Sequence, residues 1–198
     1  MNHLESGDLK MKSLTSKISF RMVVAGALVV MGAGSQAVAA EGTPFNIGEK
    51  FVLVAPADWE AKEPRSRIVE YEFETPKAEG DEFAGRVTVM GAGGGVEANI
   101  DRWKGQFKSD DGDVKADVKQ LKVADQPVHV VNIKGTYLDK PGPFVPGPGT
   151  ERPNYRMLGA IISTKDGGQY FVKLYGPEKT IAAAEPGFMK MVEGLQAK

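Results

Sequence analysis

The stretch Tyr155-Arg-Met-Leu-Gly-Ala-Ile-Ile-Ser163, continued by Thr-Lys-Asp-Gly-Gly168 and Gln-Tyr-Phe-Val-Lys-Leu-Tyr175, decides the fold. Two strand-forming runs flank an Asp-Gly pair, which supplies the positive φ angle that a tight turn between antiparallel strands needs. The run from Met157 to Ile162 is apolar at consecutive positions, so both of its faces must be covered. A strand buried on both faces predicts a sheet with helices on both sides.

Two segments have the apolar periodicity of helices that could provide this cover. The first places Val96, Ile100, Trp103 and Phe107 on one stripe, which predicts a helix with Trp103 in the core. The second lies near the C-terminus, and Pro186-Gly187 is expected to kink it or divide it in two. Its stripe consists of Ile181, Ala184, Phe188, Met191, Val192 and Leu195.

The remaining strands come from alternating or short apolar runs at 51–54, 68–73, 86–90, 115–123 and 128–137. Residues 68–73 and 86–90 are expected to form a hairpin, and 115–123, charged on both faces, suits a sheet edge. The sequence therefore predicts an α+β fold, a single-domain antiparallel β-sheet flanked by helices on both faces.

A targeting segment precedes this domain. Four basic residues lead into an apolar run at 22–31, which ends in the small residues Ser35-Gln-Ala-Val-Ala-Ala40. The apolar run is too short to span a membrane, which takes about 20 residues. We therefore predict a signal peptide at 1–40, a domain at 41–198 that is secreted or periplasmic and not membrane-embedded after cleavage, and a translation start at Met1 or Met11.

Composition excludes several function classes. Removing the leader takes away four of 25 basic and two of 26 acidic residues and leaves a net charge of about −3, which argues against nucleic acid as a partner. The chain has no cysteine, and the predicted domain has one histidine, His129, which lies in an expected strand. We therefore predict no metal site, and no Cys-His dyad or Ser-His-Asp triad.

The glycines Gly93-x-Gly95-x-x-Ala98 have the spacing of a dinucleotide-binding loop. That mechanism needs a parallel β-α-β unit, whereas the strand that leads into these glycines belongs to an expected antiparallel hairpin. We predict no dinucleotide or other cofactor here, and a helix that begins without a side-chain cap.

Candidate contact residues lie in loops. Residues 138–154 contain five prolines and three glycines and predict a long exposed loop, whose Phe144 and Val145 could anchor a partner, with Arg152 and Tyr155 at its base. Trp59, in another predicted loop, is free to stack on a ligand. Glu70 and Glu72 alternate on one strand face and offer a carboxylate pair, although a solvent-facing strand edge is the simpler interpretation.

The order of elements resembles the α/β/α sandwich of PsbP-like proteins over roughly residues 45–195. Three segments look like parts of an uncharacterised family of secreted bacterial proteins: Gly95-Val-Glu-Ala-Asn-Ile-Asp-Arg-Trp-Lys-Gly-Gln-Phe107, Tyr155-Arg-Met-Leu-Gly-Ala-Ile161 and Tyr170-Phe-Val-Lys-Leu-Tyr-Gly-Pro-Glu-Lys-Thr-Ile181. The resemblance implies a fold and an extracytoplasmic location but no activity, and no partner-binding motif of the wider fold maps onto these residues.

The function expected from these observations is a non-catalytic binding or assembly module of the periplasm or cell envelope, which contacts an envelope protein through the Pro/Gly-rich loop. Two alternatives stay open, a cofactor-free hydrolase that uses carboxylates and a carrier of a small ligand. No residue is assigned a catalytic, cofactor-binding or metal-binding role.

Overall fold

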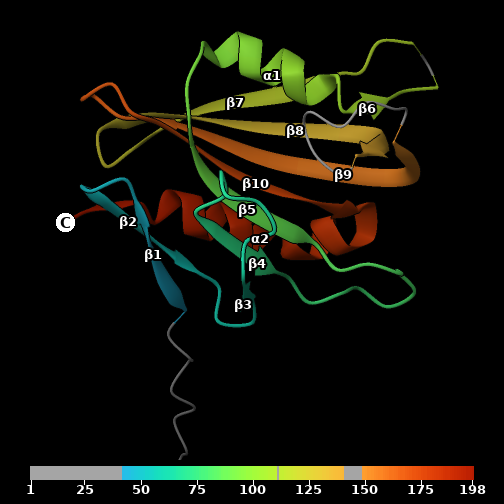
Figure 1. Ribbon diagram of the computed structural model, residues 1–198, viewed down its shortest axis with the longest axis horizontal. Coiled ribbons are helices and arrows are strands. Elements are labelled where there is room, and N and C mark those ends of the chain that lie inside the picture. Colours follow the sequence, from blue (N-terminus) through green and yellow to red (C-terminus); the bar gives the residue numbers. More distant parts are fainter. Residues whose placement is uncertain (1–41, 111, 141–148) are drawn as a thin grey trace, which may run out of the picture. The chain divides into compact units, whose positions relative to one another are not determined.

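The computed structural model describes residues 42–110, 112–140 and 149–198, which form two antiparallel sheets and two helices (Figure 1). The larger sheet has the strand order β3-β4-β5-β10-β9-β8-β6, with β7 also paired to β8. Its strands are β3 (Glu60–Lys62), β4 (Tyr71–Glu74), β5 (Arg86–Ala92), β6 (Phe107–Lys108), β7 (Ala116–Val123), β8 (Gln126–Asp139), β9 (Thr150–Ser163) and β10 (Gln169–Pro177). The helices are α1 (Val96–Lys104) and α2 (Glu178–Glu193).

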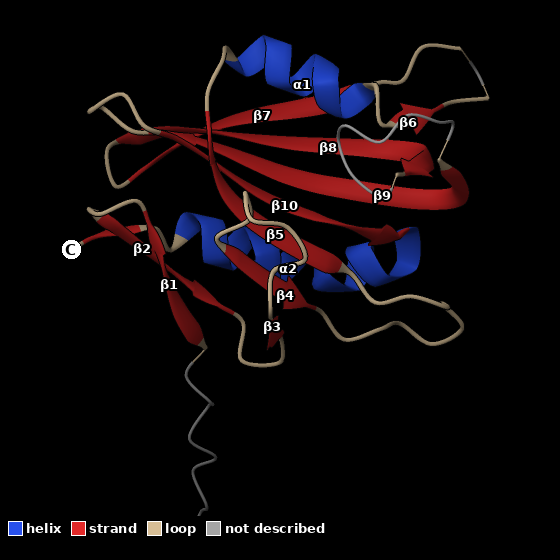
Figure 2. Ribbon diagram, viewed as in Figure 1, coloured by secondary structure: helices blue, strands red, loops and turns tan. Residues whose placement is uncertain are grey.

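A smaller sheet joins the two ends of the described chain. It has the order β1-β2-β11, formed by β1 (Thr43–Ile47), β2 (Phe51–Ala55) and β11 (Gln196–Ala197) (Figure 2). The sequence predicted β2, but it gave no sign of β1 or of β11. Phe45, Ile47 and Leu53 are buried, so this sheet also contributes to the core.

The hairpin from which the sequence argument started is confirmed. β9 and β10 pair antiparallel, and the register sets Ser163 opposite Gln169 across the turn. Met157 and Ile161 pack in the apolar cluster that contains Trp103 of α1, whereas Leu158 and Ile162 belong to the cluster that contains Phe188 of α2. Both faces of this strand are therefore covered by apolar side chains, as its consecutive apolar residues require.

The first helix is shorter than its apolar stripe predicts. α1 ends at Lys104, and Phe107 is buried from strand β6 instead of from the helix. The core position of Trp103 is confirmed, since its side chain is 3% exposed and lies directly over Gly159 of β9. The helix begins at Val96, and its N-cap residue Gly95 provides no side-chain cap, as expected from the glycine-rich connection.

The second helix continues through Pro186, so the expected division of this segment is wrong. Its attachment to the sheet includes a buried cation. Arg156 of β9 is 7% exposed and donates from both terminal nitrogens to the carboxylate of Glu185, at 2.8 and 3.0 Å. The same guanidinium donates to Asn132 of β8, so one side chain joins α2 to two central strands.

The predicted loop at 138–154 is too long by several residues, because β8 extends to Asp139 and β9 begins at Thr150. Pro153 and Asn154 are accommodated by a bulge in the pairing of β8 with β9, where Asn154 has a φ of 56°. A proline that cannot donate to a ladder is tolerated at such a bulge. The predicted tip at 141–148 lies outside the described residues.

Strand β5, which leads into Gly93 and Gly95, pairs antiparallel with both of its neighbours, β4 and β10. It therefore does not form the parallel unit on which a dinucleotide-binding loop depends. β7 pairs antiparallel with β8 and is paired on one side only, so its predicted edge position is confirmed. None of the helices in the described ranges has the length and apolar character needed to cross a membrane.

Candidate functional site

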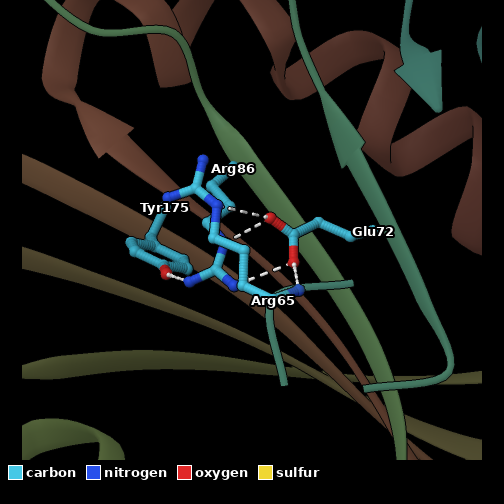
Figure 3. Close-up of polar contacts among 4 residues, drawn as sticks. All are labelled: Arg65, Glu72, Arg86 and Tyr175. Atoms are coloured by element: carbon cyan, nitrogen blue, oxygen red, sulfur yellow. Dashed lines mark hydrogen bonds and ion pairs between the residues drawn. The ribbon is translucent and has the colours of Figure 1, made fainter. Parts of the chain in front are cut away.

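A buried ion pair lies at the centre of a polar cluster on the larger sheet (Figure 3). Glu72 of β4 is 2% exposed, and its two carboxylate oxygens accept from Nε and Nη2 of Arg86, each at 2.8 Å. The backbone amide of Arg65 also donates to this carboxylate, at 3.1 Å. Burial alone would raise the pKa of Glu72, but these hydrogen bonds lower it, so the group is an ionised carboxylate.

The other end of the Arg86 guanidinium reaches strand β10. Nη1 donates to the hydroxyl oxygen of Tyr175 at 2.6 Å, which links β4, β5 and β10 through three side chains (Figure 3). The hydrogen bonds with Glu72 raise the pKa of Arg86 further, and burial raises the pKa of the Tyr175 phenol. Both groups therefore keep their protons at neutral pH.

Lys173 lies two residues before Tyr175 in β10. Its ammonium nitrogen is 4.8 Å from the centre of the Tyr175 ring and 5.6 Å from that of Tyr137, and it donates to the amide oxygen of Gln106. Burial, together with the positive charge of Arg86 and of Arg102, lowers the pKa of Lys173 to about 7. The residue as a whole is partly buried, and a lysine whose pKa lies near 7 is present both as ammonium and as neutral amine at neutral pH.

Stacked tyrosines connect Lys173 to the region where the Pro/Gly-rich segment leaves the sheet. Tyr137 stacks on Tyr155 with ring centres 5.9 Å apart and an interplanar angle of 6°, and it also packs against Tyr175 at 5.1 Å. We refer to Glu72, Arg86, Gln106, Tyr137, Tyr155, Lys173 and Tyr175 as the Lys173 cluster.

Two of the residues predicted from the loop are placed at its base. Arg152 forms an ion pair with Asp139 at 3.4 Å, and its guanidinium lies 4.5 Å from the centre of the Phe83 ring. Tyr155 belongs to the Lys173 cluster. Phe144 and Val145 lie outside the described residues, so their role as anchors stays a prediction.

The prediction for Trp59 is wrong. Its side chain is 5% exposed and packs in the same apolar cluster as Phe188, so it cannot stack on a ligand from solution. The carboxylate pair also takes a different form from the expected one. Glu70 precedes β4 and accepts the backbone amide of Gly91 at 2.9 Å, whereas Glu72 is buried on Arg86 instead of facing solvent.

Sequence reasoning missed Lys173. One signal was present: a lysine occurs in a strand whose neighbours Phe171, Val172 and Leu174 are apolar, next to a strand with both faces covered. A charged residue in such a run is under-solvated in the folded state. Its partners could not be identified, because Gln106 lies 67 residues away.

Two further features bear on the chemistry of the described part of the chain. No group of three or more histidine and carboxylate side chains there is arranged to hold a metal ion. An open groove of about 500 Å³ lies beside Phe83, and four of its nine lining residues carry carboxylates: Asp58, Glu60, Glu74 and Glu82.

Comparisons with known proteins give similar solved structures and no activity. No family model and no curated protein matches the sequence. Similar solved structures include PsbP (CyanoP) of the cyanobacterium Synechocystis, with 10% identity over 80% of this chain and 94% of that chain and a TM-score of 0.48. LpqN of Mycobacterium tuberculosis, described as involved in cell envelope biogenesis, has 11% identity over 79% and 90% of the two chains and a TM-score of 0.47.

A protein of unknown function from Pseudomonas aeruginosa is also similar, with 10% identity over 80% of this chain and 98% of that chain and a TM-score of 0.45. At these identities the similarity concerns the fold alone. The chain is similar to PsbP in fold.

Proposed function

We propose that this chain is a non-catalytic binding module of the cell envelope, and that its contact site is the Lys173 cluster. The observation that carries the proposal is a partly exposed lysine held between tyrosine rings, beside the base of the Pro/Gly-rich segment. The basic, apolar and small-residue regions of the sequence before residue 41 support an extracytoplasmic location. We further infer a single domain over 41–198, with α1 and α2 on opposite faces of its sheet.

The electrostatics favour binding over hydrolysis. A carboxylate that acts as a general acid near neutral pH needs a raised pKa, whereas the pKa of Glu72 is lowered by its hydrogen bonds to Arg86. Glu70 is engaged with the backbone of Gly91 and does not share a site with Glu72. The buried carboxylate therefore has a structural role, which is to hold Arg86 in place.

The carrier alternative receives less support, because a small apolar ligand needs an enclosed apolar cavity. The groove beside Phe83 is open rather than enclosed, and four of its nine lining residues carry carboxylates. Tyrosine and arginine side chains, in contrast, are the types that dominate contact sites between proteins, and both occur in and beside the Lys173 cluster.

Site-specific photo-crosslinking tests the proposal. A photoreactive amino acid at Tyr155 should form a discrete crosslinked product in the native envelope fraction, since this residue is part of the cluster. The matched control position is Val118 of β7, which is 42% exposed and lies on the edge strand. The substitution Lys173→Met should abolish the product from position 155.

Equal crosslinking from both positions would contradict the assignment of the contact site. The same conclusion would follow if the product from position 155 persisted in the Lys173→Met variant. Far-UV circular dichroism of each variant establishes that the fold is retained.

A further inference from the structure

Positive charge exceeds negative charge around Lys173. Glu72 is the buried carboxylate of the cluster, and both of its oxygens are occupied by Arg86 and Arg65. Within the described residues, Lys173 forms no ion pair, and its hydrogen-bond partner is the neutral amide oxygen of Gln106. The charges that act on it most strongly, those of Arg86 and Arg102, are also positive.

Arg102 is similarly without a counter-ion in the described part of the chain. Its guanidinium donates to the side-chain oxygen of Asn99 and lies 5.8 Å from the centre of the Phe171 ring, two residues from Lys173 in β10. The residue is exposed, so solvent reaches this side of the cluster. A cation that is partly removed from water and has no opposite charge raises the free energy of the folded state.

The geometry leaves donors for a ligand. An ammonium group has three N–H donors, and Gln106 accepts one of those of Lys173. The rings of Tyr137 and Tyr175 lie on the same ammonium and shield it from bulk water. Shielding strengthens the attraction of an opposite charge, because the effective dielectric constant is lower there than in water.

We propose that the Lys173 cluster binds an anionic group, a carboxylate or a phosphate, which supplies the missing counter-charge between Lys173 and Arg102. This inference rests on the proposed contact site and names the chemistry that the site recognises. The anion binds the ammonium form of Lys173 and not the neutral amine, so binding takes up a proton where the amine is deprotonated. Arg86, Tyr137 and Tyr175 keep their protons over this range, and Glu72 stays ionised.

The test is a titration of Lys173 by NMR. Lysine labelled with ¹³C at Cε gives a signal for Lys173 that is assigned by its absence from the Lys173→Met variant. The pH dependence of this signal is measured in the purified protein at low ionic strength, and again with sodium phosphate, sodium benzoate or sodium chloride at equal ionic strength. Phosphate represents a phosphoryl group, and benzoate represents a carboxylate with an apolar body.

Saturating phosphate or benzoate should raise the pKa of Lys173 by at least about one unit, which corresponds to about tenfold tighter binding of the anion by the ammonium form. Arg102→Gln should weaken the binding several-fold. The matched control is Lys104→Gln, which removes a charge from the same end of α1, from a lysine that is paired with Asp101 at 3.6 Å. Lys104→Gln should change the affinity less than about twofold.

Three results would overturn the anion site: an equal shift with chloride, which is screening alone; an equal loss of affinity in Lys104→Gln; or no shift with either probe. If crosslinking from Tyr155 depends on Lys173 while neither anion shifts its pKa, the contact site stands and the anionic ligand is wrong. If an anion shifts the pKa of Lys173 but no crosslink forms, the anion site stands and the proposed envelope partner is wrong.

Discussion

The contact between Gly159 and Trp103 offers a quantitative test of the packing between α1 and the sheet. A methyl group at Gly159 would lie 2.9 Å from Cη2 of the indole and 3.1 Å from Cε3, and closest of all to Cζ3. The indole has little freedom to withdraw, since it is 3% exposed and meets the edge of the Phe171 ring at 5.2 Å. Gly159→Ala must therefore push α1 away from β9 or force the indole out of its rotamer.

The expected cost follows from overpacking. Adding a carbon to a well-packed core lowers the free energy of unfolding by about 1 to 3 kcal/mol, and the rigid ring places Gly159→Ala toward the upper end. Trp103→Ala should cost about 3 to 5 kcal/mol, because it removes a buried aromatic side chain and leaves a cavity. In the double variant the new methyl group enters that cavity, so Gly159→Ala should cost nothing or restore part of the loss.

The assay is urea unfolding of the wild type, the two single variants and the double variant, followed by far-UV circular dichroism. The coupling energy between the two positions should be about 1 to 3 kcal/mol in favour of the double variant. Gly93→Ala is a matched control, because a methyl group there meets no atom within 4 Å. Its effect should stay within about 0.5 kcal/mol.

The reasoning is refuted if Gly159→Ala costs the same in the presence and absence of Trp103. A loss below about 1 kcal/mol for Trp103→Ala would also contradict it. The indole would then be exposed, and the apolar stripe of α1 would be a binding surface rather than part of the core.

Three other predictions concern charge and processing. Glu72→Gln should lower the free energy of unfolding by about 3 kcal/mol at pH 7, because it leaves Arg86 without its buried partner. The pKa of Glu72 is lowered in the folded state, so the stabilisation that this carboxylate provides is lost as the pH falls below 4.5, the pKa of the group in the unfolded chain. The stability of the Glu72→Gln variant should therefore depend less on pH in the acid range than that of the wild type. Folding lowers the pKa of Lys173 from 10.5 to about 7, so between these pH values the unfolded chain binds more protons than the folded protein. The urea midpoint of the wild type should therefore rise as the pH increases over this range, and the midpoint of Lys173→Met should not. Intact-mass measurement of the secreted protein should give an N-terminus at Ala40 or Glu41, and a retained leader would contradict the extracytoplasmic assignment.

Local patterns predicted the elements whose signals are contained within a few residues. The hairpin of β9 and β10 followed from two apolar runs around Asp166-Gly167, and the edge position of β7 followed from its charges. The core position of Trp103 followed from helical spacing. In each case the prediction depended on the spacing of apolar or charged residues or on a turn residue, and it needed no contact with a distant part of the chain.

The sequence analysis is wrong where contacts between distant segments of the chain determine the structure. Trp59 follows an Ala-Pro-Ala-Asp sequence typical of a loop, yet the indole is buried in the cluster that includes Phe188 of α2. The proline and glycine content of 138–154 suggested loop throughout, but pairing with β8 extends β9 back to Thr150 and isolates Pro153 in a bulge. Burial and pairing of this kind depend on partners that local composition does not specify.

Two errors of the sequence analysis have the same cause: the helix predicted to run to Phe107, and the failure to predict the environment of Lys173. In a helix that continued to Phe107, helical geometry would fix the direction of the Gln106 side chain. In the structure, α1 ends at Lys104 and the chain turns at Gly105. The carbonyl of Gln106 then accepts the backbone amide of Leu138 at 2.8 Å, which fastens this segment to β8, and its side chain is free to reach Lys173. Phe107, buried from β6, packs on the ring of Tyr137 at 5.2 Å and so helps to position the aromatic side of the same cluster. The early end of the helix therefore places Gln106 in the candidate site, and the apolar stripe could not reveal this because a buried Phe107 fits a helix and a strand equally well.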